Sequence, residues 1–194
     1  IGDIHGRLDL LAPLMEAVEC RLTPDSRLVF LGDYVDRGPE SAGVLSLLCD
    51  VRDRLGEKAV FLKGNHEEMM LSALANLESG DAENWALNGG LATLESYGWK
   101  ARDPEDVSMI PDRHLRFLRN LKLWHDDGER LFVHAGIDPS RNIDEQRERD
   151  LLWIREPFLS WNAENWGRLI VHGHTPDENG PALSRGKLNL DTKA

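Results

Sequence analysis

Short runs of apolar residues alternate along the chain with longer segments in which apolar residues recur every three or four positions. Apolar runs without polar alternation are typical of strands buried on both faces, and we expect such strands at 28–31, 59–62, 131–133 and 169–171. The three-to-four spacing is typical of helices, which we expect at 8–20, 41–55 and 66–77. This alternation predicts a layered α/β fold with ligand sites at the carboxyl ends of the strands.

The middle of the chain, residues 81–123, has the spacing of helices rather than strands. Its leucines recur on one helical face, which we expect to pack into the core, at Leu115, Leu118 and Leu121. His114 and Arg116 are predicted to be solvated rather than functional.

Nothing in the sequence divides the chain, because it has no repeat, low-complexity tract or linker rich in Pro, Gly or Ser. We therefore expect one domain over residues 1–194, with its N-terminal strand and its C-terminal strands truncated. The stretch 186–194 is predicted to be one more strand.

The composition is that of a globular protein, with 41% hydrophobic and 29% charged residues. Asp and Glu together number 34 against 23 Lys and Arg, which gives a formal net charge of −11. This surplus argues against binding of a nucleic-acid polymer or of an anionic membrane, because a polyanion requires a basic footprint. A small anionic substrate held at a local site is still compatible with it.

The two cysteines and the hydropathy of the chain bear on its compartment. Cys20 and Cys49 lie in apolar stretches without metal-like spacing, so we expect ordinary core thiols in a reducing cytoplasm. No run approaches the ~20 apolar residues that a membrane span needs.

The loops that follow the predicted strands contain the candidate chemistry. Each carries carboxylate, imidazole or carboxamide groups beside glycines, and the candidates are Asp3, His5, Asp33, Asp36, Asn65, His66, His134, His172 and His174. Singly, each fits a turn former, but five such loops are hard to explain as turns. Mixed oxygen and nitrogen ligands suit Mn, Fe or Zn, and more than four candidates favour a site for two metal ions.

Five short motifs occur in a fixed order along the chain: GDIHG at 2–6, GDYVDRG at 32–38, GNHE at 64–67, HAG at 134–136 and HGHT at 172–175. This ordered set, which spans nearly the whole chain, resembles the calcineurin-like metallophosphoesterases, and within them the phosphoprotein phosphatase superfamily. Three further segments resemble the bacterial and phage-type serine/threonine protein phosphatases of the phage lambda kind: GNHEEMM at 64–70, NWALNGG at 84–90 and LWIRE at 152–156. The resemblance implies a four-layer α/β/β/α sandwich with a dinuclear metal site at the carboxyl-terminal loops of the strands.

The resemblance also implies a role for each site residue. Asp3 and His5 would hold one metal ion, Asp33 would bridge both ions, and the second ion would be completed by Asn65, His134 and His174. His172 falls outside the family's ligand set, and we expect a structural role for it. The expected ions are divalent, with Mn²⁺ first and Fe, Zn or Mg as alternatives.

The catalytic residues implied by the resemblance are His66 as general acid, Asp36 as the residue that orients it, and Arg37 and Arg155 as a clamp on the phosphate oxygens. Asn65 would add support near the substrate. Asn88 resembles a residue near the substrate pocket, although a turn with the two glycines that follow explains it equally well. In such enzymes a hydroxide that bridges the two metal ions attacks phosphorus directly, without a phosphorylated enzyme intermediate.

Three functions compete on this fold: a protein phosphatase, a diadenosine tetraphosphatase-like nucleotide hydrolase and a non-catalytic scaffold. A scaffold would be expected to lack ligands, and none is missing here. The symmetrical diadenosine tetraphosphatases usually have Ala, Asp and Trp where this chain has Asp36, Glu67 and Thr175, which favours a protein phosphatase acting on phosphorylated proteins or peptides. We expect no dedicated regulatory subunit, because the loop signature that engages one is absent.

Most of the six tryptophans are expected to pack in the core, because Trp buries a large area. Trp85 and Trp153 lie within motifs that resemble pocket-forming segments. They are therefore the candidates for lining a pocket that accepts aromatic leaving groups.

Overall fold

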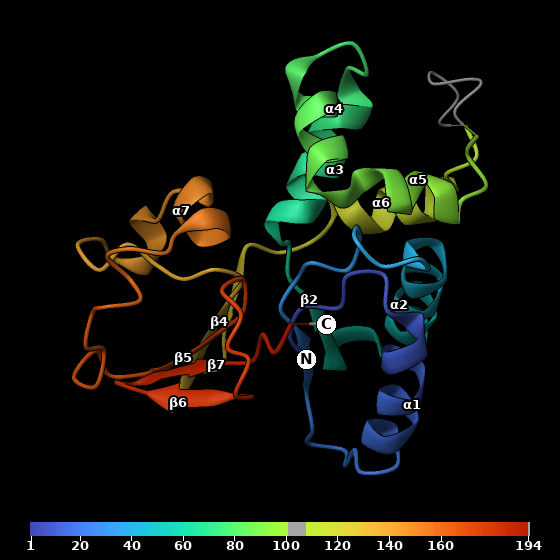
Figure 1. Cartoon of the computed structure of the whole chain (residues 1–194). Coiled ribbons are helices and arrows are strands. Elements are labelled where there is room, and N and C mark those ends of the chain that lie inside the picture. The colour runs from blue at the N-terminus through green and yellow to red at the C-terminus, as the bar shows by residue number, and fades with distance from the viewer. Residues whose placement is uncertain (101–107, 194) are drawn as a thin grey trace.

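The computed structural model describes residues 1–100 and 108–193 and consists of two packed sheets with helices on their outer faces (Figure 1). The α-helices are α1 (Leu8–Glu19), α2 (Ser41–Leu55), α3 (Asn65–Ala75), α4 (Gly80–Trp85), α5 (Leu91–Ser96), α6 (Asp112–Arg119) and α7 (Glu148–Trp153). Shorter helical turns are η1 (Gly56–Lys58), η2 (Ala86–Gly90) and η3 (Ile143–Glu145). The strands are β1 (Leu28–Phe30), β2 (Ala59–Phe61), β3 (Trp124–Asp126), β4 (Arg130–Val133), β5 (Leu169–His172), β6 (Ala182–Ser184) and β7 (Lys187–Asn189).

One sheet contains β1 and β2, which are parallel, with Val29 opposite Val60. The other has the order β3-β4-β5-β7-β6, in which β4, β5 and β7 are parallel and the two edge strands are antiparallel to their neighbours. In Figure 1, α1 and α2 lie to the right of the sheets and α7 lies above the five-stranded sheet.

The strands β1 and β2 and most of β5 are buried, as their unbroken apolar character predicts, whereas the edge strand β3 is half-buried and the edge strand β6 is largely exposed. In β1, Phe30 points into a core shared with the helices, whereas Val29 points into a small apolar layer between the two sheets. In β5, Val171 belongs to that same layer, and Ile170 packs on the opposite side, in the core that includes Leu151 of α7. The order of layers is therefore helices, sheet, sheet and helix, which confirms the expected α/β/β/α sandwich.

Two details of the predicted core differ from the structure. His114 is buried rather than solvated, because its ring nitrogens are engaged by the hydroxyls of Tyr97 at 2.7 Å and Ser46 at 3.2 Å. Cys20 is exposed at the end of α1 rather than in the core, whereas Cys49 is buried as expected. Part of the predicted helical stretch 81–123 lies outside the described residues; the rest contains α4, α5 and α6. The predicted final strand is present as β7.

Among the described residues, none of the helices combines the length and the apolar character that crossing a bilayer requires.

A buried lysine on β7 holds the loop that follows α7. The ammonium of Lys187 donates to the carbonyls of Phe158 at 2.6 Å, Leu159 at 2.9 Å and Trp161 at 2.7 Å. It also lies 4.8 Å from the centre of the Phe158 ring, which adds a cation–π contact. The loop that contains Arg155 is thereby attached to the five-stranded sheet.

We expect Lys187→Met to lower the free energy of unfolding by about 3 kcal/mol, because it leaves buried carbonyls without a donor. Urea unfolding would show this as a lower midpoint with an unchanged slope. The control Lys193→Met removes only an exposed ion pair with Glu178 and should cost under about 1 kcal/mol. An unchanged midpoint for Lys187→Met would show that Lys187 does not hold the loop after α7 to the five-stranded sheet.

Candidate metal centre and active site

The loops after β1 and β2 are joined by a buried glutamate. The carboxylate of Glu67 accepts the backbone N–H groups of Asp33 at 2.8 Å, Tyr34 at 2.7 Å and Gly64 at 2.8 Å. A side chain at Gly64 would place its Cβ atom 2.1 Å from Oδ1 of Asp33, so only glycine fits there. Glu67 and Gly64 therefore hold the Asp33 loop against the start of α3.

The backbone of these loops is strained where the chemistry is concentrated. Seven non-glycine residues among those described have a positive φ angle, and five of the seven are His5, Asp33, Asp36, Arg37 and His174. Such conformations are unfavourable for residues with a Cβ atom and persist where the surrounding structure imposes them, commonly at functional sites. The hydrogen bonds to Glu67 supply part of that constraint.

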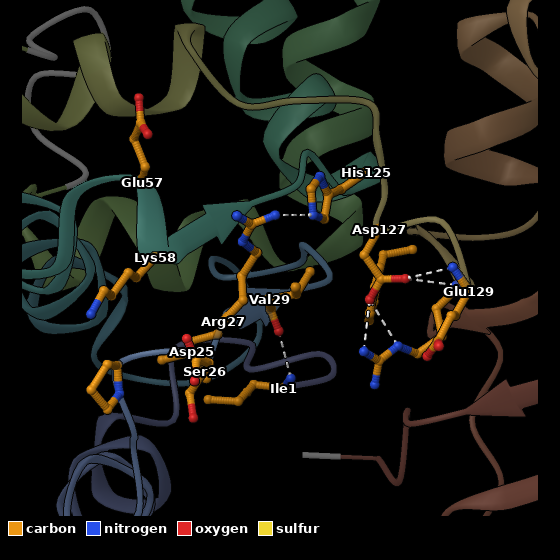
Figure 2. A pocket seen from close by; sticks show the side chains of 14 residues that line it. Ile1, Asp25, Ser26, Arg27, Val29, Glu57, Lys58, His125, Asp127 and Glu129 are labelled. Atoms are coloured by element: carbon orange, nitrogen blue, oxygen red, sulfur yellow. Dashed lines mark hydrogen bonds and ion pairs between the residues drawn. The ribbon is translucent and has the colours of Figure 1, made fainter.

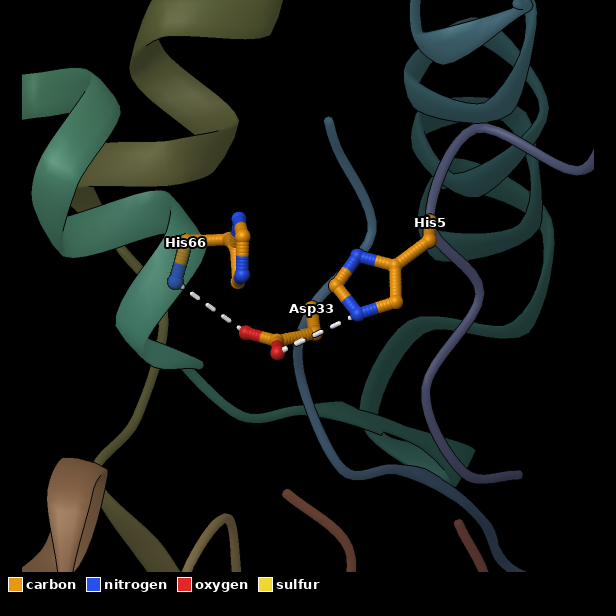
Figure 3. A group of neighbouring side chains, drawn as sticks. All are labelled: His5, Asp33 and His66. Carbon is orange, nitrogen blue, oxygen red and sulfur yellow. Dashed lines mark hydrogen bonds and ion pairs between the residues drawn. The ribbon is translucent and has the colours of Figure 1, made fainter. Parts of the chain in front are cut away.

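One group of potential metal ligands comprises His5, Asp33 and His66, shown in Figure 3. Nε2 of His5 lies 3.6 Å from Oδ2 of Asp33, and the backbone N–H of His66 donates to Oδ1 at 3.1 Å. Nδ1 of His5 lies 3.0 Å from the carbonyl oxygen of Val35 and donates its proton there. The lone pair of Nε2 is consequently directed into the site.

A second group shares Asp33 and adds His134 and His174. Nδ1 of His134 donates to the carbonyl of Leu31 at 2.9 Å, so its Nε2 carries a lone pair, 2.9 Å from Oδ1 of Asn65 and 3.4 Å from Oδ1 of Asp33. Nδ1 of His174 also lies 2.9 Å from Oδ1 of Asn65.

Lone pairs of acceptor atoms thus converge in a buried space, an arrangement that a cation would stabilise. The mixed nitrogen and oxygen donors of this set suit a divalent transition metal. The residues present therefore fit a divalent metal centre.

Burial shifts the pKa values of the imidazoles and of Asp33 in opposite directions. Burial lowers the pKa of His5 and of His66 to about 3 and that of His174 to about 4, so the imidazoles are neutral at pH 7. Burial, reinforced by the charges of Asp3 and Glu67, raises the pKa of Asp33 well above its usual value. A nearby cation would offset that unfavourable charge, whereas it does not compete with protons for neutral imidazoles.

Among the described residues, Asp3 belongs to neither group of potential metal ligands, although it contacts His174 of the second group. Its two oxygens accept the backbone N–H of His174 at 3.2 and 3.3 Å. The carboxyl of Asp191, which the sequence did not single out, lies within hydrogen-bonding reach of Asp3. Burial and then the charge of Asp191 raise the pKa of Asp3, which indicates a surplus of negative charge on this side of the site.

Arg37 is the cation closest to these groups. Its Nη1 donates to Nε2 of His5 at 2.8 Å and its Nη2 donates to Nε2 of His66 at 3.0 Å. The backbone N–H of Arg37 donates to the carbonyl of Gly89 at 3.2 Å. The guanidinium is therefore directed at the Nε2 atoms of both imidazoles, which accept its hydrogen bonds.

Arg155 and Asn88 lie at the margin of the site. Arg155 is exposed, and its charge contributes to lowering the pKa of His174. Asn88 is exposed as well, and its amide donates to the backbone carbonyl of Asn84 at 2.8 Å. In this structure the amide of Asn88, which lies in η2, therefore bonds back to the preceding helical turn.

The two tryptophans singled out by the sequence have different surroundings. Trp85 is 2% exposed, and its indole N–H lies 2.9 Å from each carboxylate oxygen of Asp36. Trp153 is 37% exposed, and its ring meets that of His174 edge-on at 6.2 Å. Its N–H donates to Glu68 at 2.6 Å, at a small cavity of about 190 Å³.

His172 joins neither group among the residues that the structure describes. Its ring packs edge-on against Phe158 at 5.0 Å, and its Nδ1 lies 3.2 Å from the carbonyl oxygen of Gly173. This environment is that of a packed core histidine.

A larger cavity, of about 750 Å³, lies elsewhere, at the amino ends of the strands (Figure 2). Leu28 and Arg130, the first residues of β1 and β4, line it together with Arg27 and His125. It contains none of the groups described above, so cavity size does not locate the chemistry in this chain.

Comparison with known proteins identifies the family. The model of the calcineurin-like phosphoesterases matches residues 1–192, and the chain belongs to this metallophosphoesterase family. It is 31% identical over 181 residues to serine/threonine-protein phosphatase 1 of Salmonella typhimurium, covering 91% of this chain and 77% of the relative. It is 28% identical over 217 residues to the asymmetrical bis(5'-nucleosyl)-tetraphosphatase PrpE of Geobacillus thermodenitrificans, covering 99% and 83%.

The fold has a close counterpart among solved structures. A protein serine/threonine phosphatase from Saccharomyces cerevisiae superposes with a TM-score of 0.64 at 18% identity, covering 98% of this chain and 65% of that one. At this identity the likeness concerns the fold alone. The chain thus belongs to a phosphoesterase family that uses divalent metal ions. One of its relatives is named as a protein phosphatase and another as a bis(5'-nucleosyl)-tetraphosphatase.

Proposed function

We propose that this protein is a metal-dependent phosphomonoesterase that acts on phosphorylated proteins or peptides, on phosphoserine and phosphothreonine first, with phosphotyrosine as a second substrate class. The observation that carries the proposal is the pair of buried ligand groups sharing Asp33, with the guanidinium of Arg37 and the His66–Asp36 pair beside them. This arrangement offers a cationic cradle for a phosphate dianion and a proton donor next to it.

In the proposed site, His5 and Asp33, with Asp3 at their edge, hold one divalent ion, and Asp33, Asn65, His134 and His174 hold the other. When bound, such ions would neutralise phosphate charge and lower the pKa of a bound water towards neutral pH. We expect manganese, because donors of mixed nitrogen and oxygen type suit it.

The chain's own residues bind and orient the phosphate. Arg37 presents two N–H groups, which match the geometry of phosphate oxygens, and Arg155 supplies a second guanidinium from the loop after α7. The charge of Arg37 is also one cause, after burial, of the lowered pKa of His66. A phosphate dianion bound at Arg37 offsets that charge and so favours the protonated imidazole needed for donation to the leaving oxygen.

Dinucleotide hydrolysis is the second candidate, supported by the relative named as a bis(5'-nucleosyl)-tetraphosphatase. The geometry of Asp36 supports the protein phosphatase instead. Its Oδ2 lies 2.7 Å from Nδ1 of His66, which provides the acid pair suited to expelling a poor alkoxide leaving group. The symmetrical dinucleotide hydrolases usually have Ala at this position.

A direct comparison of substrates tests the proposal. With Mn²⁺ supplied, we expect kcat/KM for a phosphoserine peptide to exceed that for diadenosine tetraphosphate by at least about tenfold, or about 1.4 kcal/mol in the transition state. A phosphotyrosine peptide in the same series measures how far aryl esters are accepted, and chelator-treated protein is the control. A larger kcat/KM for the dinucleotide would reject the protein phosphatase in favour of the second candidate.

A further inference from the structure

Residues of α4 and α5 contact the side chain of Asp36, which lies about fifty residues earlier in the sequence. Asp36 is fully buried, and Trp85 donates its indole N–H to both carboxylate oxygens at 2.9 Å. Thr93 adds two contacts: its Oγ1 accepts the backbone N–H of Asp36 at 2.8 Å, and its hydroxyl donates to Oδ1 at 2.7 Å.

These contacts leave the carboxylate little freedom to rotate. Trp85 and Thr93 hold Oδ1, while Oδ2 receives the indole N–H and the Nδ1–H of His66 at 2.7 Å. Because Asp36 binds Nδ1, the Nε2 atom of His66 must face the site, where Arg37 lies 3.0 Å away. Residues of α4 and α5 therefore fix the orientation of the His66 imidazole through Asp36.

Two glycines of the same segment make this contact possible. A Cβ atom at Gly90 would lie 2.5 Å from the indole of Trp85, so the ring fits only over a glycine. Gly89 has a φ of 104°, and its carbonyl accepts the backbone N–H of Arg37. The NWALNGG motif at 84–90 thus contacts Asp36 through Trp85 and Arg37 through Gly89.

We propose that Trp85 and Thr93 are positioning residues for proton transfer to the leaving group, acting through Asp36 on His66. The proposal rests on the proposed function. In the step concerned, water is the co-substrate: its oxygen forms a new bond to phosphorus as the ester P–O bond breaks. The electron pair of the broken bond goes to the leaving oxygen, which takes the proton from Nε2 of the His66 imidazolium. His66 becomes neutral and keeps its Nδ1–H hydrogen bond to Asp36, and the proton lost by the water restores the imidazolium for the next cycle.

The dependence of rate on the leaving group tests this role. An alkoxide from phosphoserine needs a proton to depart, whereas p-nitrophenolate departs readily without one. We expect Thr93→Val, which keeps the shape of the side chain, to lower kcat about 10–100-fold for a phosphoserine peptide but less than about threefold for p-nitrophenyl phosphate. KM and metal content should not change, and Trp85→Phe should have the same pattern.

Matched variants separate positioning from a loss of structure. Thr93→Ser keeps the hydroxyl and should restore the rate for the phosphoserine peptide. Trp166→Phe removes an indole that packs against Trp161, away from the site, and should leave both rates unchanged. Circular dichroism of each variant checks the fold.

Equal losses on both substrates, or a loss of metal with Thr93→Val, would overturn the positioning role. The proposed function is judged separately, by the unmodified protein: if it hydrolyses diadenosine tetraphosphate in preference to the phosphopeptide, the substrate class is wrong. The ratio of the variant's two rates still tests the positioning role in that case, because both phosphomonoesters are assayed as chemical probes.

Discussion

Asp33→Asn is expected to remove both metal ions and to lower kcat by more than about 10³-fold, because the ions supply several kcal/mol of transition-state stabilisation. Asp33 is shared by the two ligand groups, so the loss of its charge weakens both at once. Metal analysis after dialysis should show the metal-to-protein ratio falling from two towards zero. Asp53→Asn, which changes only an exposed carboxylate paired with arginines, is the matched control.

The expected loss of metal and of activity in Asp33→Asn does not come from unfolding of the protein. In the metal-free protein, burial and the charges of Asp3 and Glu67 disfavour ionised Asp33, as its raised pKa indicates. A neutral amide avoids that repulsion, so metal-free Asp33→Asn should be at least as stable to heat as the metal-free unmodified protein. Two ions still bound to Asp33→Asn would show that Asp33 is not the bridging ligand.

His66→Asn is expected to lower kcat for a phosphoserine peptide by about 10²–10⁴-fold, which is the usual contribution of a general acid. Both metal ions should stay bound, because neither proposed ligand set includes His66, whose Nδ1 donates to the carboxylate of Asp36. Steady-state kinetics and metal analysis of the same sample measure the two effects. His125→Asn, in the distant cavity, is the control.

Metal analysis of this variant also decides between two ligand sets. The structure groups His66 with His5 and Asp33, whereas the sequence motifs assign Asp3 to that ion. Loss of one ion per chain in His66→Asn would make His66 a ligand and contradict the general-acid role. Retention of both ions together with unchanged kcat would contradict that role too.

The sequence predicted the parts of this protein that depend on local pattern. The four apolar runs became β1, β2, β4 and β5, because strands buried on both faces are apolar at every position. The loops that follow carry every member of the two ligand groups except His5, because the carboxyl ends of neighbouring parallel strands meet at one edge of a sheet. Family resemblance added the order of these loops.

Contacts between distant segments were not predictable in this way. Trp85 and Asp36 are 49 positions apart, and a tryptophan at the end of a short helix gives no sign of whether its N–H will meet a carboxylate. The same is true of Thr93, at 57 positions from Asp36. His114 was misjudged because a helical histidine among charged neighbours is usually exposed, whereas here Tyr97 and Ser46 satisfy its nitrogens in the interior.

The ligand groups draw on both sheets of the sandwich. Asp33 and Asn65 follow β1 and β2, whereas His134 and His174 follow β4 and β5. The sheets are joined by a small apolar layer and by polar contacts such as the hydrogen bond from His134 to the carbonyl of Leu31, and both cysteines are free thiols. An ion at the second group is consequently a cross-link between the two halves of the protein, and the stability it adds rises with the concentration of free metal.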